Sequence, residues 1–259
     1  MPTKLERLMA KAIADQRESS NFFQALMEAS VYAHIPLEDR IGDDVDRIRF
    51  VQFHRPDNDQ LTLPFFTDEA KAQAATGASV QVIEMIGRDF FELTLGATLM
   101  MDPNDWSCTL YPEEVEALLR TGRVATIETF VVKEKAEPLV GPPQGHPARL
   151  IDELTRTLAT LPFIQTAYLA GVYNRTDVPE QTGFILALGG DPKQAERATH
   201  AIATALQLTC TGHSNLPVDV GYFDIRGDAP SWVTGLGLQS FYDRRWGARL
   251  FPTSGIPKI

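Results

Sequence analysis

Apolar residues near the start of the chain recur three and four positions apart, which is the spacing of one face of an α-helix. The first set is Leu5, Leu8, Met9, Ala12 and Ile13, and the second is Phe22, Phe23, Leu26 and Met27. The pattern predicts a helical pair or one kinked helix, with Ser19 or Ser20 as an N-cap.

Strands follow in the first half, because apolar and polar residues then alternate over short runs bounded by turn residues. The expected strands span residues 31–35, 48–53, 61–66, 79–84 and 98–101. Residues 56–59 have the composition of a hairpin turn. Thr67 is expected to cap a short helix, and Pro112 to open a helix that stops at Gly122.

The second half alternates between helix and strand more plainly. A helix is expected from Pro147 to Pro162, and another from residue 191 through about residue 206. Strands are expected at residues 165–172, 183–188 and 218–223, with a short helix after Pro230. This order predicts an α+β fold in which helices cover one face of a sheet.

A Pro/Gly-rich stretch at residues 136–147 separates two halves of different charge. Residues 1–141 carry 14 Lys and Arg against 24 Asp and Glu, whereas residues 142–259 carry 10 of each. We therefore predict two α/β-sandwich domains joined by a Pro/Gly-rich linker. The expected boundaries are an acidic N-terminal domain at 1–132, a linker at 133–146 and a C-terminal domain at 147–259.

Composition narrows the class of partner. A net charge of −10 argues against nucleic acid and against anionic membrane surfaces. The two cysteines lie in different halves, as is typical of a reducing compartment. There is no apolar run long enough to span a membrane and no apolar core of a signal peptide near residue 1. We expect a cytoplasmic protein.

Three stretches together are similar to a known family. They are the opening helices leading into residues 31–32, the segment from Leu63 through residues 101–115, and the second half with residues 167–169, 218–220 and 240–242. These residues resemble the bacterial SseB-like family, which has separate N- and C-terminal domains. Asp102-Pro103-Asn104 stands where an Asn-Pro-Gly turn is usual in that family. The resemblance implies a fold and brings no catalytic residues.

Motifs that would specify a chemistry are absent from the sequence. It contains no zinc-binding spacing, no phosphate-binding or dinucleotide-binding glycine loop, and no nucleophile elbow. We therefore predict no catalytic residue, no metal site and no cofactor. His34 and His54 lie on or beside adjacent expected strands and could converge, although buried or solvated structural roles are favoured.

The segment at residues 241–252 combines three arginines with four aromatic residues, and arginine, tyrosine and tryptophan dominate binding hot spots. We predict that it binds a partner through Tyr242, Arg244, Arg245, Trp246 and Arg249. The competing interpretation is that its aromatic residues pack into the core and fix the end of the chain.

The leading hypothesis is a non-enzymatic cytoplasmic interaction or regulatory protein that acts by binding a protein partner. The acidic first half would steer basic surfaces toward it. One alternative is an enzyme or small-ligand-binding protein with a site in the inter-domain cleft, using His34, His54 and the residues between Arg244 and Arg249. Another is a self-assembling protein that forms a homodimer.

Overall fold

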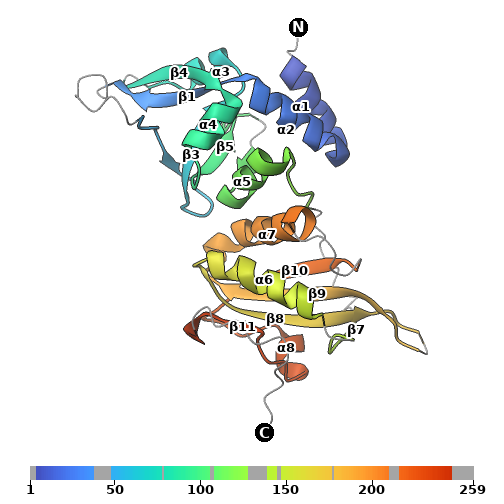
Figure 1. Cartoon of the computed structure of the whole chain (residues 1–259). Helices are drawn as coiled ribbons and strands as arrows, with labels where there is room; N and C mark the ends of the chain where they lie inside the picture. Colours follow the sequence, from blue (N-terminus) through green and yellow to red (C-terminus); the bar gives the residue numbers. More distant parts are fainter. Residues whose placement is uncertain are drawn as a thin grey trace. The chain divides into compact units, whose positions relative to one another are not determined.

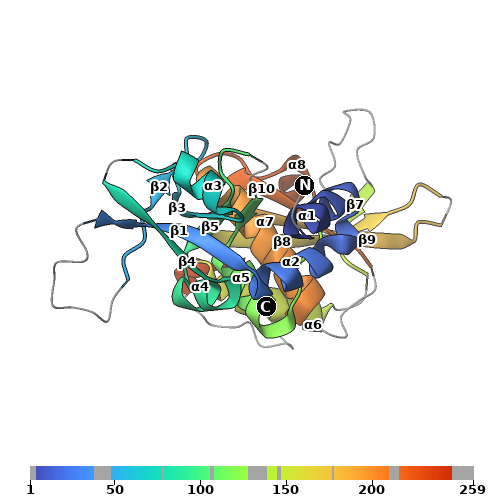
Figure 2. The same ribbon diagram turned by 90° about the horizontal axis from the view of Figure 1, so that it is seen from above.

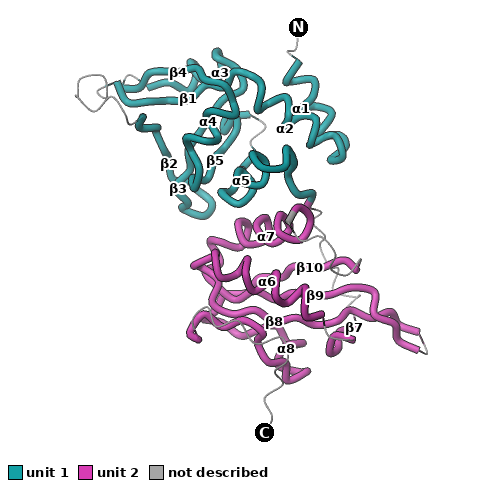
Figure 3. Tube along the Cα trace, viewed as in Figure 1, with its two compact units in different colours: residues 1–126 teal, residues 127–259 magenta. Residues whose placement is uncertain are grey.

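A computed structural model gives the fold of residues 4–37, 48–77, 79–105, 108–127, 139–144, 147–176, 178–209 and 216–246. The chain divides into two compact units, unit 1 at Met1–Thr126 and unit 2 at Ile127–Ile259 (Figure 3). Each unit has its own sheet and its own apolar core (Figure 1).

Unit 1 begins with two helices and continues with strands that alternate with short helices. In chain order its elements are α1 (Lys4–Ala14), a 3-10 turn (Gln16–Glu18), α2 (Ser19–Glu28), β1 (Ser30–Pro36), β2 (Phe53–His54), β3 (Leu61–Phe66), α3 (Glu69–Ala74), β4 (Val80–Ile86), α4 (Gly87–Leu93), β5 (Thr98–Met101), β6 (Cys108–Leu110) and α5 (Pro112–Thr121).

The unit 1 sheet is mixed, with strand order β4-β1-β3-β5-β6 and β2 paired to β3. β3 and β5 are parallel and the other pairs are antiparallel. α5 ends as the sequence predicts, because Gly122 adopts φ 71°, a left-handed conformation that glycine reaches without strain.

Helices α1, α2, α4 and α5 cover one face of this sheet and form the unit 1 core, whereas α3 packs on the other face, where His34 contacts Ala72. Phenylalanines of α2, β3 and α4 meet in the core, and Phe65 lies 5.2 Å from Phe90 and 5.8 Å from Phe91 between ring centroids. Each of these rings is fully buried, and burying such a side chain stabilises a fold by about 1.5–3 kcal/mol. The apolar spacing in the sequence indicated the correct buried face of α2, whereas Ile13 of the first predicted set is 54% exposed.

Unit 2 contains β7 (Leu139–Gly141), α6 (Ala148–Thr160), β8 (Ile164–Tyr173), β9 (Gln181–Gly190), a 3-10 turn (Pro192–Gln194), α7 (Ala195–Thr204), a π-helical turn (Ala205–Thr209), β10 (Val218–Asp224), α8 (Ser231–Gly235), β11 (Tyr242–Asp243) and a 3-10 turn (Arg244–Trp246). Strand order is β10-β9-β8-β11, with β7 also paired to β8. β9 and β10 are parallel, and the other pairs are antiparallel.

The unit 2 core lies between this sheet and helices α6 and α7 (Figures 1 and 2). Leu150, Leu154 and Leu158 of α6 are each at most 2% exposed and follow the predicted helical spacing. The predicted α+β fold class is confirmed.

Several expected details are wrong. Residues 48–52 alternate in polarity, yet only Phe53–His54 form a strand. Phe50 instead packs its ring against Phe90, and Val51 N–H makes a single backbone bond to His34 O. Neither Ser19 nor Ser20 is an N-cap, because the 3-10 turn before α2 is capped by Asp15. Asp68 rather than Thr67 caps α3.

Part of the stretch predicted as a linker belongs to the second sheet. Leu139–Gly141 form β7, which pairs with Gly171–Tyr173 at one end of β8. The predicted domain boundaries themselves stay a prediction. No helix within the described ranges is both long and apolar enough to cross a membrane.

Candidate functional site

The terminal segment of unit 2 is fixed to the sheet by β11. Tyr242 pairs with Ala167 and Asp243 with Thr166 of β8. Tyr242 is only 5% exposed, and its hydroxyl donates a hydrogen bond to Leu158 O at 3.2 Å. The phenol and its ring are therefore part of the core, as the competing interpretation expected for the aromatic residues.

Arg244 binds the carboxyl end of helix α6. Its guanidinium donates to the backbone oxygens of Leu158 (3.1 Å), Leu161 (2.7 Å) and Ile164 (2.8 Å). The last carbonyls of a helix lack intrahelical partners and carry partial negative charge, so an arginine there stabilises the helix end. The guanidinium of Arg244 therefore makes these three hydrogen bonds within unit 2.

Arg245 turns outward from the same segment. Its guanidinium pairs in a two-pronged fashion with Asp243, at 2.6 Å between Nη2 and Oδ2, and its backbone N–H donates to Oδ1 at 3.0 Å. The hydrogen bonds from Arg245 lower the pKa of Asp243. The Asp243 side chain is 6% exposed and that of Arg245 is 82% exposed. A buried carboxylate thus orients an exposed arginine.

Trp246 ends the described part of the segment and is 50% exposed, unusually high for so large an apolar side chain. Arg249 lies outside the described residues. Of the five predicted contact residues, the structure therefore places Arg245 and Trp246 on the surface and Tyr242 and Arg244 within unit 2. We call Arg245 and Trp246 the terminal pair.

The two candidate histidines do not come together. His34 is 5% exposed, and its Nε2 lies 2.9 Å from the backbone oxygen of Ala72 in α3. His54 is exposed, and its Nδ1 lies 3.2 Å from the backbone oxygen of Asp59. Within the ranges that the structure describes, no three His, Cys, Asp or Glu residues are arranged to bind a metal ion.

A charged cluster that the sequence analysis missed lies at the carboxyl ends of parallel strands β3 and β5. Asp102 is 1% exposed, and its carboxylate accepts hydrogen bonds from the Thr67 N–H (2.9 Å) and hydroxyl (2.6 Å). Lys71 donates to Asp102 at 2.9 Å and lies 3.0 Å from Asp105. Burial lowers the pKa of Lys71, but the two carboxylates more than offset this and raise it.

Asp102 also adopts φ 44°, a left-handed conformation that is uncommon outside glycine, asparagine and aspartate. The bonds to Thr67 and Lys71 hold it there. No local pattern identifies this cluster, because Asp102 is separated from Thr67 by 35 residues and from Lys71 by 31.

A shallow cavity of about 330 Å³ lies beside the cluster. Met9, Ala10 and Ile13 of α1 form its apolar side, and Glu6, Lys71 and Asp105 form its polar side. The volume is at the lower end of the range for small-molecule sites, and the charged groups nearest to it already pair with one another.

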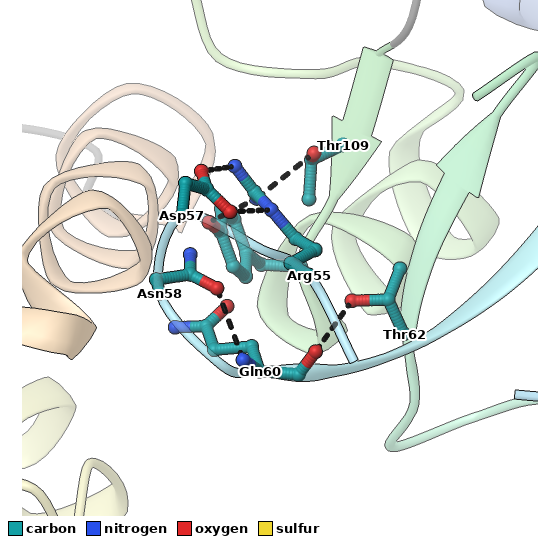
Figure 4. A network of polar contacts seen from close by, with 7 residues as sticks. Arg55, Asp57, Asn58, Gln60, Thr62 and Thr109 are labelled. Atoms are coloured by element: carbon teal, nitrogen blue, oxygen red, sulfur yellow. Dashed lines mark hydrogen bonds and ion pairs between the residues drawn. The ribbon is translucent and has the colours of Figure 1, made fainter. Parts of the chain in front are cut away.

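A second polar network fixes the β2–β3 hairpin (Figure 4). Arg55 is 9% exposed and pairs with Asp57 through two hydrogen bonds. It also donates to the hydroxyls of Thr109 (3.2 Å) and Tyr111 (3.3 Å). These contacts connect the hairpin to β6 and the start of α5, so the network has a structural role.

Comparison with known proteins supports the resemblance seen in the sequence. Residues 5–117 match the family model described as SseB protein N-terminal domain. The first part of the chain is thus similar to the SseB N-terminal domain. Protein SseB of Escherichia coli (strain K12) and Protein SseB of Shigella flexneri are each 26% identical to it over 259 residues, covering 95% of this chain and 94% of the relative. No solved structure matches the chain.

The SseB N-terminal domain match lies within unit 1 and includes both Lys71 and Asp102. Similarity to the two full-length SseB relatives extends through unit 2 as well. The name Protein SseB, which both relatives carry, specifies no reaction.

Proposed function

We propose that this SseB-like protein is a non-enzymatic cytoplasmic interaction protein that binds a protein partner through the terminal pair of unit 2. The observation that carries the proposal is the exposure of Trp246 on a rigidly held segment. Half of this side chain is accessible while the preceding residues are locked into β11 and onto α6.

Rigid presentation favours binding, because a side chain that is already ordered loses little conformational entropy on association. The Arg244 and Tyr242 contacts fix the backbone, and the buried carboxylate of Asp243 fixes the Arg245 guanidinium. Tryptophan and arginine are also among the residue types most enriched at binding hot spots. The terminal pair thus combines a preferred composition with a fixed geometry.

The negative charge of unit 1 supports a second contribution to partner binding. Residues 1–126 carry 12 Lys and Arg against 21 Asp and Glu, whereas residues 127–259 carry 12 against 13. We propose that the acidic unit raises the rate of encounter with a basic partner, as exposed charges do by steering. We propose no catalytic role, because the polar clusters described above, around Asp102, Arg55 and Asp243, are engaged in internal contacts.

Partner capture with matched variants tests this function. Purified full-length protein, immobilised at its amino end, is exposed to a lysate of its own source. Trp246→Ala is expected to weaken retention of a specific partner by about tenfold or more, typical of a hot-spot residue. Arg245→Gln is expected to weaken it by a smaller factor.

Arg226→Gln is the matched control, because Arg226 repeats the same arrangement at the end of β10. It pairs with Asp224 two residues earlier at 2.9 Å and its side chain is 79% exposed. A partner retained by the wild type and by Arg226→Gln, but lost with Trp246→Ala, supports the proposal. If Trp246→Ala folds normally and retains every partner, the terminal pair is not the recognition surface.

A further inference from the structure

β4 forms one edge of the unit 1 sheet and carries few of the features that protect such edges. It pairs with β1 in continuous antiparallel register from Ser30↔Ile86 to Pro36↔Val80, without a bulge. Within the described residues, no strand pairs with its other side. Its sequence, VQVIEMI, contains neither proline nor lysine, the residues that commonly block pairing at an edge.

Two hydrogen bonds at the ends of the ladder establish which backbone groups of β4 face outward. Leu37 N–H donates to Ser79 O at 3.0 Å, and Gly87 N–H donates to Ala29 O at 2.9 Å. Both bonds continue the β1–β4 register, in which hydrogen-bonded and non-hydrogen-bonded pairs alternate. Odd-numbered β4 residues therefore bond to β1, and the N–H and C=O groups of Val82 and Glu84 point away from it.

Side chains of β4 differ between the two faces of the sheet. Ile83 and Met85 pack against the apolar core on the α4 side. Val82 and Glu84 lie on the opposite face, where they pair with His34 and Tyr32 of β1.

The face that carries Glu84 is acidic. Burial raises the pKa of Tyr32, and the negative charges of Glu84, Glu69 and Asp68 raise it further. Three carboxylates are thus close to the Tyr32 hydroxyl. Lys71, on the nearby helix α3, already pairs with Asp102 and Asp105.

We propose that the outer edge of β4 binds an extended segment of a partner protein in which basic and apolar residues alternate. The segment adds to the sheet as a new strand through backbone bonds to Val82 and Glu84, the binding mode known as β-augmentation. Its basic side chains lie on the face of Glu84, and its apolar side chains continue the row of Ile83 and Met85.

Charge favours such a partner over a second copy of this chain. Pairing of two β4 edges would bring two sets of carboxylates onto the same face, whereas a basic segment neutralises the one set present. This inference is independent of the terminal pair, which lies on the other unit, so either can fail without the other.

A designed peptide, acetyl-Lys-Val-Lys-Ile-Lys-Val-Lys-amide, is the probe, added to the full-length protein. Hydrogen exchange followed by NMR is expected to show fast exchange of the Val82 and Glu84 amides in the free protein. Saturation with peptide should slow both by about tenfold or more, as paired strand amides are protected. The neighbouring Ile83 amide should be protected in both states.

Backbone-modified peptides separate strand addition from simple charge attraction. Two versions are N-methylated at alternate residues, one at the lysines and one at the apolar positions. One version should lose binding while the other keeps it, because only one edge of the added strand faces β4. Equal binding of all three peptides, or unchanged exchange of the two amides, overturns the proposal.

Variants of the protein complete the test. Val82→Pro removes an outward N–H, a change that edge strands tolerate, and should weaken peptide binding about tenfold. Glu84→Lys should also weaken it, whereas Glu92→Lys on α4, an exposed site with the same change of charge, should not. If Val82→Pro disrupts folding, the methylated peptides still decide the outcome. A peptide-free dimer that protects the same amides identifies a second copy as the occupant and overturns the proposed partner.

Discussion

Arg244 and Arg245 are neighbours in the chain, yet their side chains have opposite roles. Arg244 turns inward to two carbonyl oxygens at the end of α6 and one at the start of β8, while Arg245 turns outward and pairs with the carboxylate of Asp243. The difference comes from the acceptors available on each side of the segment, and residue type does not determine it. A hot-spot composition therefore identifies a segment, whereas only the fold distinguishes anchors from exposed contact residues.

The same distinction separates the buried cluster of unit 1 from the terminal segment of unit 2. In unit 1, Lys71 pairs with Asp102, and Asp102 also accepts a hydrogen bond from Thr67 between β3 and α3. The Asp102 side chain has no exposed surface. In unit 2, the buried carboxylate of Asp243 holds an arginine that remains largely in solvent. The first arrangement stabilises the fold, and the second also presents a charge.

Substitution at Asp102 should have the largest effect on stability. Asp102→Ala leaves the Thr67 N–H without its acceptor and Lys71 with one carboxylate, so unit 1 should lose about 2–4 kcal/mol. Asp105→Ala, at a carboxylate that is 47% exposed, should cost less than about 1 kcal/mol. Denaturant-dependent hydrogen exchange by mass spectrometry measures unit 1 separately. Equal losses for the two variants would contradict the structural role of Asp102.

Arg244→Ala should have the next largest effect, confined to unit 2. Three charge-assisted bonds to carbonyls at the end of α6 and the start of β8 are lost, and we expect a decrease of about 1.5–3 kcal/mol in the free energy of unfolding. Arg244→Lys should not restore it, because one ammonium cannot reproduce the planar donor geometry. Arg245→Ala should cost about 1 kcal/mol or less, since its guanidinium is solvated. The same exchange measurement compares the three variants. A larger loss of stability for Arg245→Ala than for Arg244→Ala would contradict the assigned roles of the two arginines.

Removing β7 should have a smaller effect on the stability of unit 2. A fragment of residues 127–259 should be more stable than one of residues 147–259, which lacks the strand paired to Gly171–Tyr173. We expect a difference of about 1–2 kcal/mol from the lost backbone pairing, measured by urea unfolding. Equal stability would show that residues 139–141 behave as linker, as the sequence suggested.

The lowered pKa of Asp243 should produce the smallest effect, a modest sensitivity of unit 2 to acid. A carboxylate whose folded pKa lies below its unfolded value, about 3.9, contributes stability above that value. The contribution is lost as pH falls through the folded pKa. Unfolding of the wild type and of Asp243→Asn between pH 6 and pH 2 tests this, and the difference between them should shrink below about pH 4. A difference that grows at low pH would contradict the sign.

Much of the fold could be predicted from the sequence, because long amphipathic segments carry their own signal. The spacing of Leu150, Leu154 and Leu158 located α6, and the residues of β5 were predicted without error. The short strands β6, β7 and β11 have two or three residues each and owe their conformation to a longer neighbour. Periodicity cannot reveal elements of that length.

The candidate sites were less predictable, for a related reason. The segment containing Arg245 and Trp246 could be found by composition, but the inward direction of Arg244 depends on where α6 ends, more than 80 residues away. The Asp102 cluster depends on the parallel pairing of β3 with β5, which no local motif indicates. Both features belong to tertiary structure alone.

Photo-crosslinking at position 246 tests the central claim most directly. A benzoylphenylalanine residue replaces Trp246 in one variant and Ile225 in the control, where the side chain is 41% exposed beside Arg226. Irradiation in a lysate of the protein's own source should give a discrete protein adduct from position 246, weakened by Arg245→Gln and absent from position 225. The same adducts from both positions, or none from position 246, would contradict a recognition surface at the terminal pair.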